Sequence, residues 1–222
     1  MFRIKICGLT SVDDAAAVVE AGADAIGLNF YARSPRFVPH DSARDIVRAI
    51  GPRACKVGLF VNSPAEEITE IYDELGLDLI QLHGDESPDI LRELAPRPVM
   101  RAFRVGPDGL RPVRRWMEAS LRMSLFPKLV LFDAYQPGQY GATGTTTDWS
   151  LARAYREKRG MPPLVLAGGL KGENVAEAIA AVGPAAVDVA GGVERAPGRK
   201  DHDRVREFVA AARAAFLLGK TA

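Results

Sequence analysis

Short apolar segments rich in β-branched residues alternate with amphipathic segments along the whole chain, and this rhythm constrains the fold more than any other feature. Eight of the apolar segments are expected to form strands, at residues 2–7, 24–30, 55–61, 78–83, 98–104, 128–134, 163–167 and 186–190. Eight strand–helix units in 222 residues leave about 28 residues for each unit, a length that suits parallel strands joined by helical crossovers.

Eight strand–helix units are the number required for a closed (β/α)8 barrel of the TIM type, which needs at least roughly 200 residues. The alternative is a doubly wound open sheet, but this fold usually needs only about five or six strands and would leave two or three unexplained. No linker, composition break or other repeat divides the chain. The sequence therefore predicts an α/β fold, with residues 1–222 forming a single (β/α)8-barrel domain.

Capping residues mark several expected helix starts. In the segment 63–66, Ser63 is a candidate N-cap, Pro64 the first helical residue and Glu66 an acidic residue of the first turn. Three more helices are expected over about 149–158, 173–182 and 200–217, where they follow Asp148, Gly172 and Pro197.

Charge and cysteine content exclude several classes of protein. Lys and Arg number 29 and Asp and Glu 28, for a formal net charge of +1, so no nucleic-acid partner is expected. No uncharged, proline-free run reaches about 18 residues, and no signal-peptide core follows Met1, so no membrane association is expected. Two cysteines, Cys7 and Cys55, are too few for a secreted disulfide framework, which favours a reduced, cytoplasmic protein.

Polar residues occur on only one side of most expected strands. Side chains alternate across a strand, and in a barrel one set faces the interior while the other packs under the helices. In most of these strands one set is apolar, whereas the other carries polar residues near the C-terminal end, where (β/α)8 barrels hold their active sites. The sequence therefore predicts that Lys5, Cys7, Asn29, Gln81, His83, Arg101, Asp133 and Asp188 converge at this end.

Two glycine pairs, Gly168-Gly169 and Gly191-Gly192, follow the seventh and eighth expected strands. Loops at these positions commonly hold a phosphate through backbone N–H groups, and glycine lets the backbone approach it closely. A small phosphorylated molecule is therefore the expected ligand. No group of His, Cys, Asp and Glu has the spacing of metal ligands, so no metal is expected.

Motifs that run in order from residue 3 to about residue 201 resemble those of the phosphoribosylanthranilate isomerase family of tryptophan biosynthesis. None is specific alone, but their ordered combination is. The segments are 5–10 (KICGLT), 33–38 (RSPRFV), 57–62 (VGLFVN), 81–84 (QLHG), 133–134 (DA), 141–144 (GATG), 148–149 (DW), 166–170 (LAGGL), 193–194 (VE) and 197–198 (PG).

The resemblance implies an Amadori rearrangement of N-(5-phosphoribosyl)anthranilate to 1-(2-carboxyphenylamino)-1-deoxyribulose 5-phosphate, without cofactor or metal. It implies that Asp133 is the general acid that opens the furanose ring and Cys7 the general base that removes the C2′ proton. Arg36 is expected to bind the anthranilate carboxylate and the Gly168-Gly169 and Gly191-Gly192 pairs the phosphate. Further candidate substrate contacts are Gln81, His83 and Asp188, although a purely structural role for His83 and Asp188 is an open alternative.

Two features qualify this interpretation. Ala190-Gly191 stands where the family usually has Ser-Ser, so two hydroxyl donors to the phosphate are absent while backbone donation remains. An ordinary thiol has a pKa of about 8.5 and burial raises it, so Cys7 needs help to act as a base. Lys5, two residues away on the same face, is a candidate cation that would lower the thiol pKa.

Three questions remain open at the level of sequence. Competing functions are those of another phosphate-binding barrel, such as a relative of indole-glycerol-phosphate synthase or thiamine-phosphate synthase, and of a non-catalytic barrel that binds a phosphorylated metabolite. The glycine-rich segment 135–147 is either a lid or a surface loop. The protein is expected to be a monomer or a homodimer.

Overall fold

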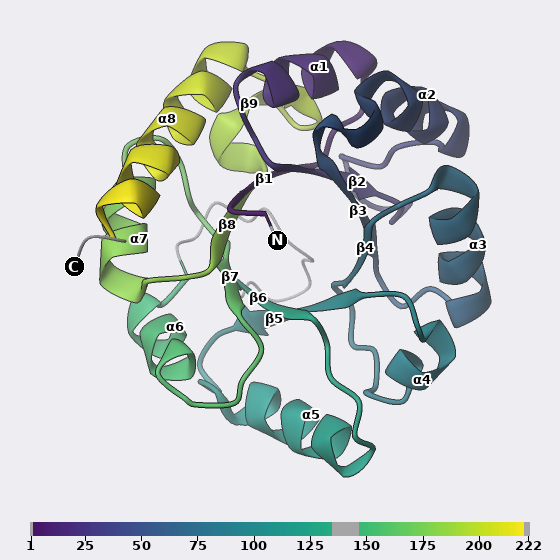
Figure 1. The fold of residues 1–222 in the computed structure, drawn as a ribbon, viewed down its shortest axis with the longest axis vertical. Coiled ribbons are helices and arrows are strands. Elements are labelled where there is room, and N and C mark those ends of the chain that lie inside the picture. The colour runs from purple at the N-terminus through teal and green to yellow at the C-terminus, as the bar shows by residue number, and fades with distance from the viewer. Residues whose placement is uncertain (1, 135–146, 220–222) are drawn as a thin grey trace.

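The computed structural model describes residues 2–134 and 147–219 of the chain. Eight parallel strands pair in chain order and close on themselves, because β1 is hydrogen-bonded to both β2 and β8 (Figure 1). The strands of the barrel are β1 (Ile4–Cys7), β2 (Ala25–Asn29), β3 (Cys55–Phe60), β4 (Leu79–Leu82), β5 (Val99–Val105), β6 (Leu129–Ala134), β7 (Leu164–Leu166) and β8 (Ala186–Val189). The predicted (β/α)8 barrel is confirmed, and the open sheet was the wrong alternative.

Helices form a ring around this barrel (Figure 1). They are α1 (Val12–Glu20), α2 (His40–Ile50), α3 (Ala65–Leu75), α4 (Ile90–Leu94), α5 (Arg111–Arg122), α6 (Trp149–Arg156), α7 (Val175–Val182) and α8 (His202–Leu218). Short 3-10 helices occur at η1 (Gly51–Arg53) and η2 (Gly191–Val193), and the strands β9 (Glu194–Ala196) and β10 (Arg199–Lys200) form a small antiparallel hairpin after η2. None of the helices in the described ranges is long and apolar enough to cross a membrane.

Several helix starts differ from the expected ones. Ser63 is not an N-cap: Pro64 takes that position, α3 begins at Ala65, and no side chain caps it. The last helix begins after Asp201, whose carboxylate accepts the N–H groups of residues 203 and 204, because the β9–β10 hairpin occupies the residues expected to start it. Asp148, in contrast, caps α6 as expected.

Two layers of apolar side chains hold the barrel together. Ile4, Ile6, Val130 and Phe132 belong to the layer between the strands and the helices. The barrel interior is filled by the other set of strand side chains together with Phe2, which precedes β1. The set includes Ala25, Val57, Leu79, Met100, Ala102, Leu129, Leu131, Val165 and Ala186. Except on β5, the alternation inferred from the sequence is the one that the barrel uses, and it turns Cys7 and Asp133 toward the interior.

The prediction that Arg101 points into the mouth of the barrel was wrong. Met100 and Ala102 pack inside the barrel, so Arg101 between them points outward, toward the layer under the helices. Its guanidinium lies 5.1 Å from the ring centre of Phe103 and 5.7 Å from that of Trp116, on α5. It therefore does not converge with the other polar residues at the mouth of the barrel.

Candidate active site

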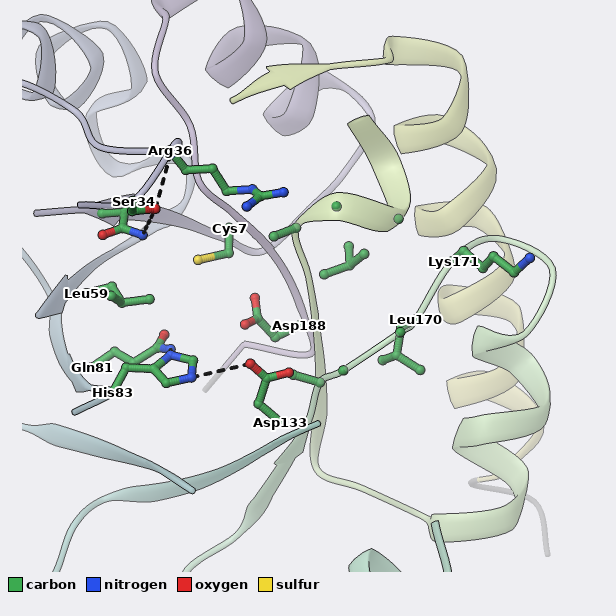
Figure 2. Close-up of a pocket in the computed structure, with 18 of the residues that line it drawn as sticks. Cys7, Ser34, Arg36, Leu59, Gln81, His83, Asp133, Leu170, Lys171 and Asp188 are labelled. Atoms are coloured by element: carbon green, nitrogen blue, oxygen red, sulfur yellow. Dashed lines mark hydrogen bonds and ion pairs between the residues drawn. The ribbon is translucent and has the colours of Figure 1, made fainter. Parts of the chain in front are cut away.

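A cavity of about 520 Å³ opens at the C-terminal ends of the strands (Figure 2). Of the predicted polar residues, Cys7, Asn29, Gln81, His83, Asp133 and Asp188 line it, as do Arg36 and both glycine pairs. Lys5 lies beneath it, fully buried. The segment 135–146, which contains the 141–144 motif and nearly all of the expected lid, lies outside the described residues.

Asp133 is the penultimate residue of β6 and points into the cavity, opposite Cys7 (Figure 2). Its Oδ1 accepts the backbone N–H of Ala134 at 2.9 Å. Its Oδ2 lies 3.3 Å from Nε2 of His83, close enough for an ion pair but without the alignment of a hydrogen bond. The Asp133 carboxyl group is thus held by its neighbours in one orientation, with its outer oxygen beside the cavity.

His83 is oriented by Gln81, two residues before it at the end of β4. The Gln81 amide Nε2 donates to Nδ1 of His83 at 3.0 Å, which makes Nε2 the protonated nitrogen of the neutral ring. Oε1 of Gln81 and Nε2 of His83 are buried and have no hydrogen-bond partner within the described residues. Buried polar atoms are rarely left in this state, so both atoms are suited to meet a polar ligand.

Cys7 ends β1 and directs its thiol into the cavity (Figure 2). Gly27 on β2 makes room for it, since a Cβ at that position would lie 2.6 Å from the Cys7 Sγ. Burial raises the pKa of the Cys7 thiol, the Lys5 ammonium lowers it, and Asp188 raises it; the pKa is raised overall. Lys5 therefore acts in the expected direction, but its effect is smaller than that of burial.

Lys5 and Asp188 form a buried ion pair beside this thiol, with Nζ and Oδ1 2.9 Å apart. Burial lowers the pKa of Lys5, but the charges of Asp188 and Cys7 outweigh it, so the pKa lies above its ordinary value and the side chain stays protonated. The pair places one positive and one negative charge next to Cys7. Asp188 also presents its carboxylate to the cavity, as expected of a substrate contact.

Arg36 reaches the cavity from the loop after β2 and is held by Glu194. Its Nε donates to Glu194 Oε1 at 2.9 Å and its Nη2 to Oε2 at 2.6 Å. Lys200 shares the same carboxylate, with Nζ 2.8 Å from Oε1, and also donates to the backbone oxygen of Cys7 at 2.6 Å. Burial raises the pKa of Glu194, but its bonds to Arg36 and Lys200 lower it overall, so the carboxylate stays charged between these two side chains. Burial lowers the pKa of Lys200, against the charge of Glu194.

The two glycine pairs lie side by side at the ends of β7 and β8. A Cβ on Gly192 would collide with the backbone oxygen of Leu170, and the left-handed Gly168 (φ +84°) packs against Thr147 and Ala134 in the same way. Among the described residues, no acceptor is bonded to the N–H groups of Gly168, Gly169, Gly191 or Gly192. The loops therefore present backbone donors to the cavity, an arrangement suited to an anion.

Three residues to which the sequence analysis gave no role, Asn174, Glu194 and Lys200, help to build the site. Asn174 shapes the first glycine loop, because its Oδ1 accepts the N–H of Lys171 and its Nδ2 donates to Gly169 O. Glu194 holds Arg36, and Lys200 binds the Glu194 carboxylate. The 193–194 motif was the only advance signal for Glu194, and Lys200 had none. The described residues contain no group of three or more His, Cys, Asp and Glu side chains that could hold a metal ion.

Comparisons with known proteins find relatives over nearly the whole chain. A family model described as N-(5′phosphoribosyl)anthranilate (PRA) isomerase matches residues 4–211. The N-(5′-phosphoribosyl)anthranilate isomerase of Geobacter metallireducens is 46% identical over 215 residues, which cover 96% of this chain and 100% of that protein. The crystal structure of phosphoribosyl anthranilate isomerase from Thermotoga maritima aligns with a TM-score of 0.83 and 39% identity over 96% of this chain and 100% of that one.

A further crystal structure contains a ligand. It is phosphoribosyl anthranilate isomerase in complex with reduced 1-(o-carboxyphenylamino)-1-deoxyribulose 5-phosphate. It aligns with a TM-score of 0.79 and 38% identity, covering 96% of this chain and all of that one (100%).

Proposed function

Since the chain belongs to the N-(5′-phosphoribosyl)anthranilate isomerase family, we propose that it converts N-(5′-phosphoribosyl)anthranilate to 1-(2-carboxyphenylamino)-1-deoxyribulose 5-phosphate, with Asp133 as general acid and Cys7 as general base. The observation that carries the assignment of roles is that these two groups enter one cavity from opposite walls (Figure 2). Family membership decides against the alternative barrel functions left open by the sequence.

The reaction divides into two proton transfers. Asp133 donates its proton to the furanose ring oxygen, the C1′–oxygen bond breaks, and the electron pair of the anilino nitrogen forms an iminium ion with C1′. Cys7 then removes the proton from C2′, and the C2′–H electrons form the carbon–carbon double bond of an enolamine. The enolamine tautomerises to the ketone. A positioned acid or base of this kind contributes about 10²- to 10⁴-fold to the rate.

The anionic ends of the substrate fit the two positive regions of the cavity. The N–H groups of the paired glycine loops would bind the phosphate, with Ala190 and Gly191 contributing no hydroxyl group. Arg36 would bind the anthranilate carboxylate, because Glu194 occupies Nε and Nη2 while no acceptor among the described residues bonds to Nη1. Gln81, His83 and Asp188 face the sugar between these ends, where a polyol needs polar partners.

The test is the loss of anthranilate-type fluorescence when the purified protein meets freshly generated phosphoribosylanthranilate. Turnover without added cofactor or metal, and unaffected by a chelator, is the expected result. A folded protein that leaves the substrate unchanged would refute the proposal. Retention of the product analogue by such an inactive protein would identify it as a binding protein instead.

Replacing Gly192 with Ala tests the proposed phosphate site. The added methyl group would meet the backbone oxygen of Leu170, so the two glycine loops must separate. The free energy of unfolding should fall by about 1–3 kcal/mol. KM should rise about tenfold, equivalent to ~1.4 kcal/mol of lost binding.

Gly172→Ala is the matched control, because a Cβ there would meet nothing closer than 3.5 Å. Gly172 lies in the loop after β7, which carries the other glycine pair, and its replacement should change neither quantity appreciably. Urea unfolding and steady-state kinetics on both variants give the comparison. An unchanged KM in Gly192→Ala would remove the glycine loops from the phosphate site.

A further inference from the structure

Arg101 is a charged residue in an apolar layer, and the proposed chemistry does not use it. Its side chain is buried on the outer side of β5, and the whole residue is only 5% exposed. Removing a guanidinium from water is costly, and apolar residues of similar volume often replace buried ion pairs without loss of stability. Stability alone therefore gives no reason for an arginine here, and its hydrogen bonds indicate what it holds.

The Arg101 guanidinium binds the backbone on both sides of His83. Nη1 donates to the carbonyl oxygen of Leu82 at 3.0 Å, and Nη2 donates to that of Gly84 at 3.0 Å. The planar fork of arginine can hold both oxygens at once, whereas a lysine ammonium lacks this geometry. Phe103 and Trp116 contact the guanidinium, and this further restricts its orientation.

Glu86 binds both Arg101 and the backbone of the loop that follows His83. Its Oε2 accepts from Arg101 Nη1 at 2.9 Å, while its Oε1 accepts the N–H groups of Gly84 at 3.1 Å and Asn62 at 2.9 Å. Its backbone oxygen accepts the indole N–H of Trp116 at 3.0 Å. The loop that follows His83 is thereby tied to β5, to α5 and to the loop after β3.

We infer that Arg101 and Glu86 are positioning residues that act through His83: their ion pair fixes the backbone around His83 and so keeps its Nε2 beside the Asp133 carboxyl group. The contact between Nε2 and Oδ2 is 3.3 Å, so a small movement of the loop breaks or tightens it. His83 in turn orients the acid that opens the sugar ring. The inference rests on the proposed function of Asp133 and extends it to a network outside the cavity.

Arg101→Lys and Glu86→Gln test the inference, because each keeps a polar side chain of similar length but weakens the ion pair. We expect kcat to fall about tenfold or more with KM changed less than about twofold, since the substrate's anionic ends bind elsewhere. Arg97→Lys is the control for the chemical change. Arg97 pairs with Asp73 at the surface, so its replacement should leave kcat unchanged.

A double-mutant cycle with His83→Asn separates positioning from a general structural role. If Arg101 acts through His83, then Arg101→Lys should lower kcat little further in the His83→Asn background. Full additivity of the two losses would overturn the inference. So would a normal kcat in Arg101→Lys, whatever happens to its stability.

Nitrogen NMR of the three histidine rings gives a readout that does not depend on turnover. The signal that disappears in His83→Asn identifies His83, which should be mainly the Nε2–H tautomer in the parent protein. Arg101→Lys should shift this signal toward a mixture of tautomers, and an unchanged signal would refute the inference. A parent protein without turnover but with this shift would refute the proposed function and leave the positioning network standing.

Discussion

Asp133→Asn is expected to lower kcat by about 10²-fold or more, the usual contribution of a positioned general acid. The amide keeps the shape of the side chain and an oxygen that can accept the Ala134 N–H, so this hydrogen bond at the end of β6 is kept. What it cannot do is donate a proton to the ring oxygen and become a stable anion. Steady-state kinetics by the fluorescence assay measure the effect, and unchanged thermal unfolding would show that it is catalytic.

Asp73→Asn is the matched control, because it makes the same change at an exposed carboxylate on α3, which is paired with Arg97. Its kcat should equal that of the parent protein. A kcat within about threefold of the parent in Asp133→Asn would remove Asp133 as the acid. The ring oxygen would then need another donor, and the adjacent Nε2 of His83 is the first to test.

Strand alternation predicted much of the site because it is a local property. The alternation of Ile4 and Ile6 with Lys5 and Cys7 placed Cys7 inside the barrel, and Asp133 followed from the same argument on β6. The same argument predicted the wrong direction for Arg101. Both faces of β5 carry apolar residues, Met100 and Ala102 on one and Phe103 on the other. Apart from Lys5, the barrel interior below its mouth is lined largely by apolar residues, so polarity alone does not tell which face of such a strand points inward.

Contacts between distant segments could not be predicted from the sequence. Arg36 and Glu194 are 158 residues apart, and nothing local indicates that they share three hydrogen bonds. Lys200 looks like a surface residue, yet it is a buried residue of β10 whose ammonium donates to the backbone oxygen of Cys7. Such pairs depend on which loops meet at the mouth of the closed barrel.

Cys7→Ala is expected to lower kcat by about 10²-fold or more, because no other described group near Cys7 is a plausible carbon base: Lys5 is protonated and Asp188 is paired with it. Cys55→Ala is the matched control. Cys55 lies at the start of β3, at the opposite end of the barrel, and packs on the interior layer. Its replacement should leave kcat unchanged, whereas equal losses in both variants would indicate a defect in packing.

The raised pKa of the Cys7 thiol makes a further prediction about pH. The reactive state, a protonated Asp133 and a Cys7 thiolate, carries one proton on the pair, as does the state with the proton on Cys7. The ratio of these two states does not depend on pH, so with rising pH kcat/KM should fall when the pair loses this proton, at the pKa of the thiol. Because burial raises that pKa, the alkaline limb should lie above the ordinary thiol value of about 8.5.

Lys5→Met tests whether the Lys5 ammonium lowers the pKa of the Cys7 thiol. Without the ammonium, burial and Asp188 both raise the thiol pKa further, so the alkaline limb should move to higher pH. The plateau should fall about tenfold for each unit of that shift, because the reactive state becomes rarer by that factor. Titration of the thiolate by ultraviolet absorbance measures the same pKa directly, with Cys7→Ala as the blank. A limb that moves to lower pH, or a thiol pKa that does not rise, would show that Lys5 does not assist Cys7.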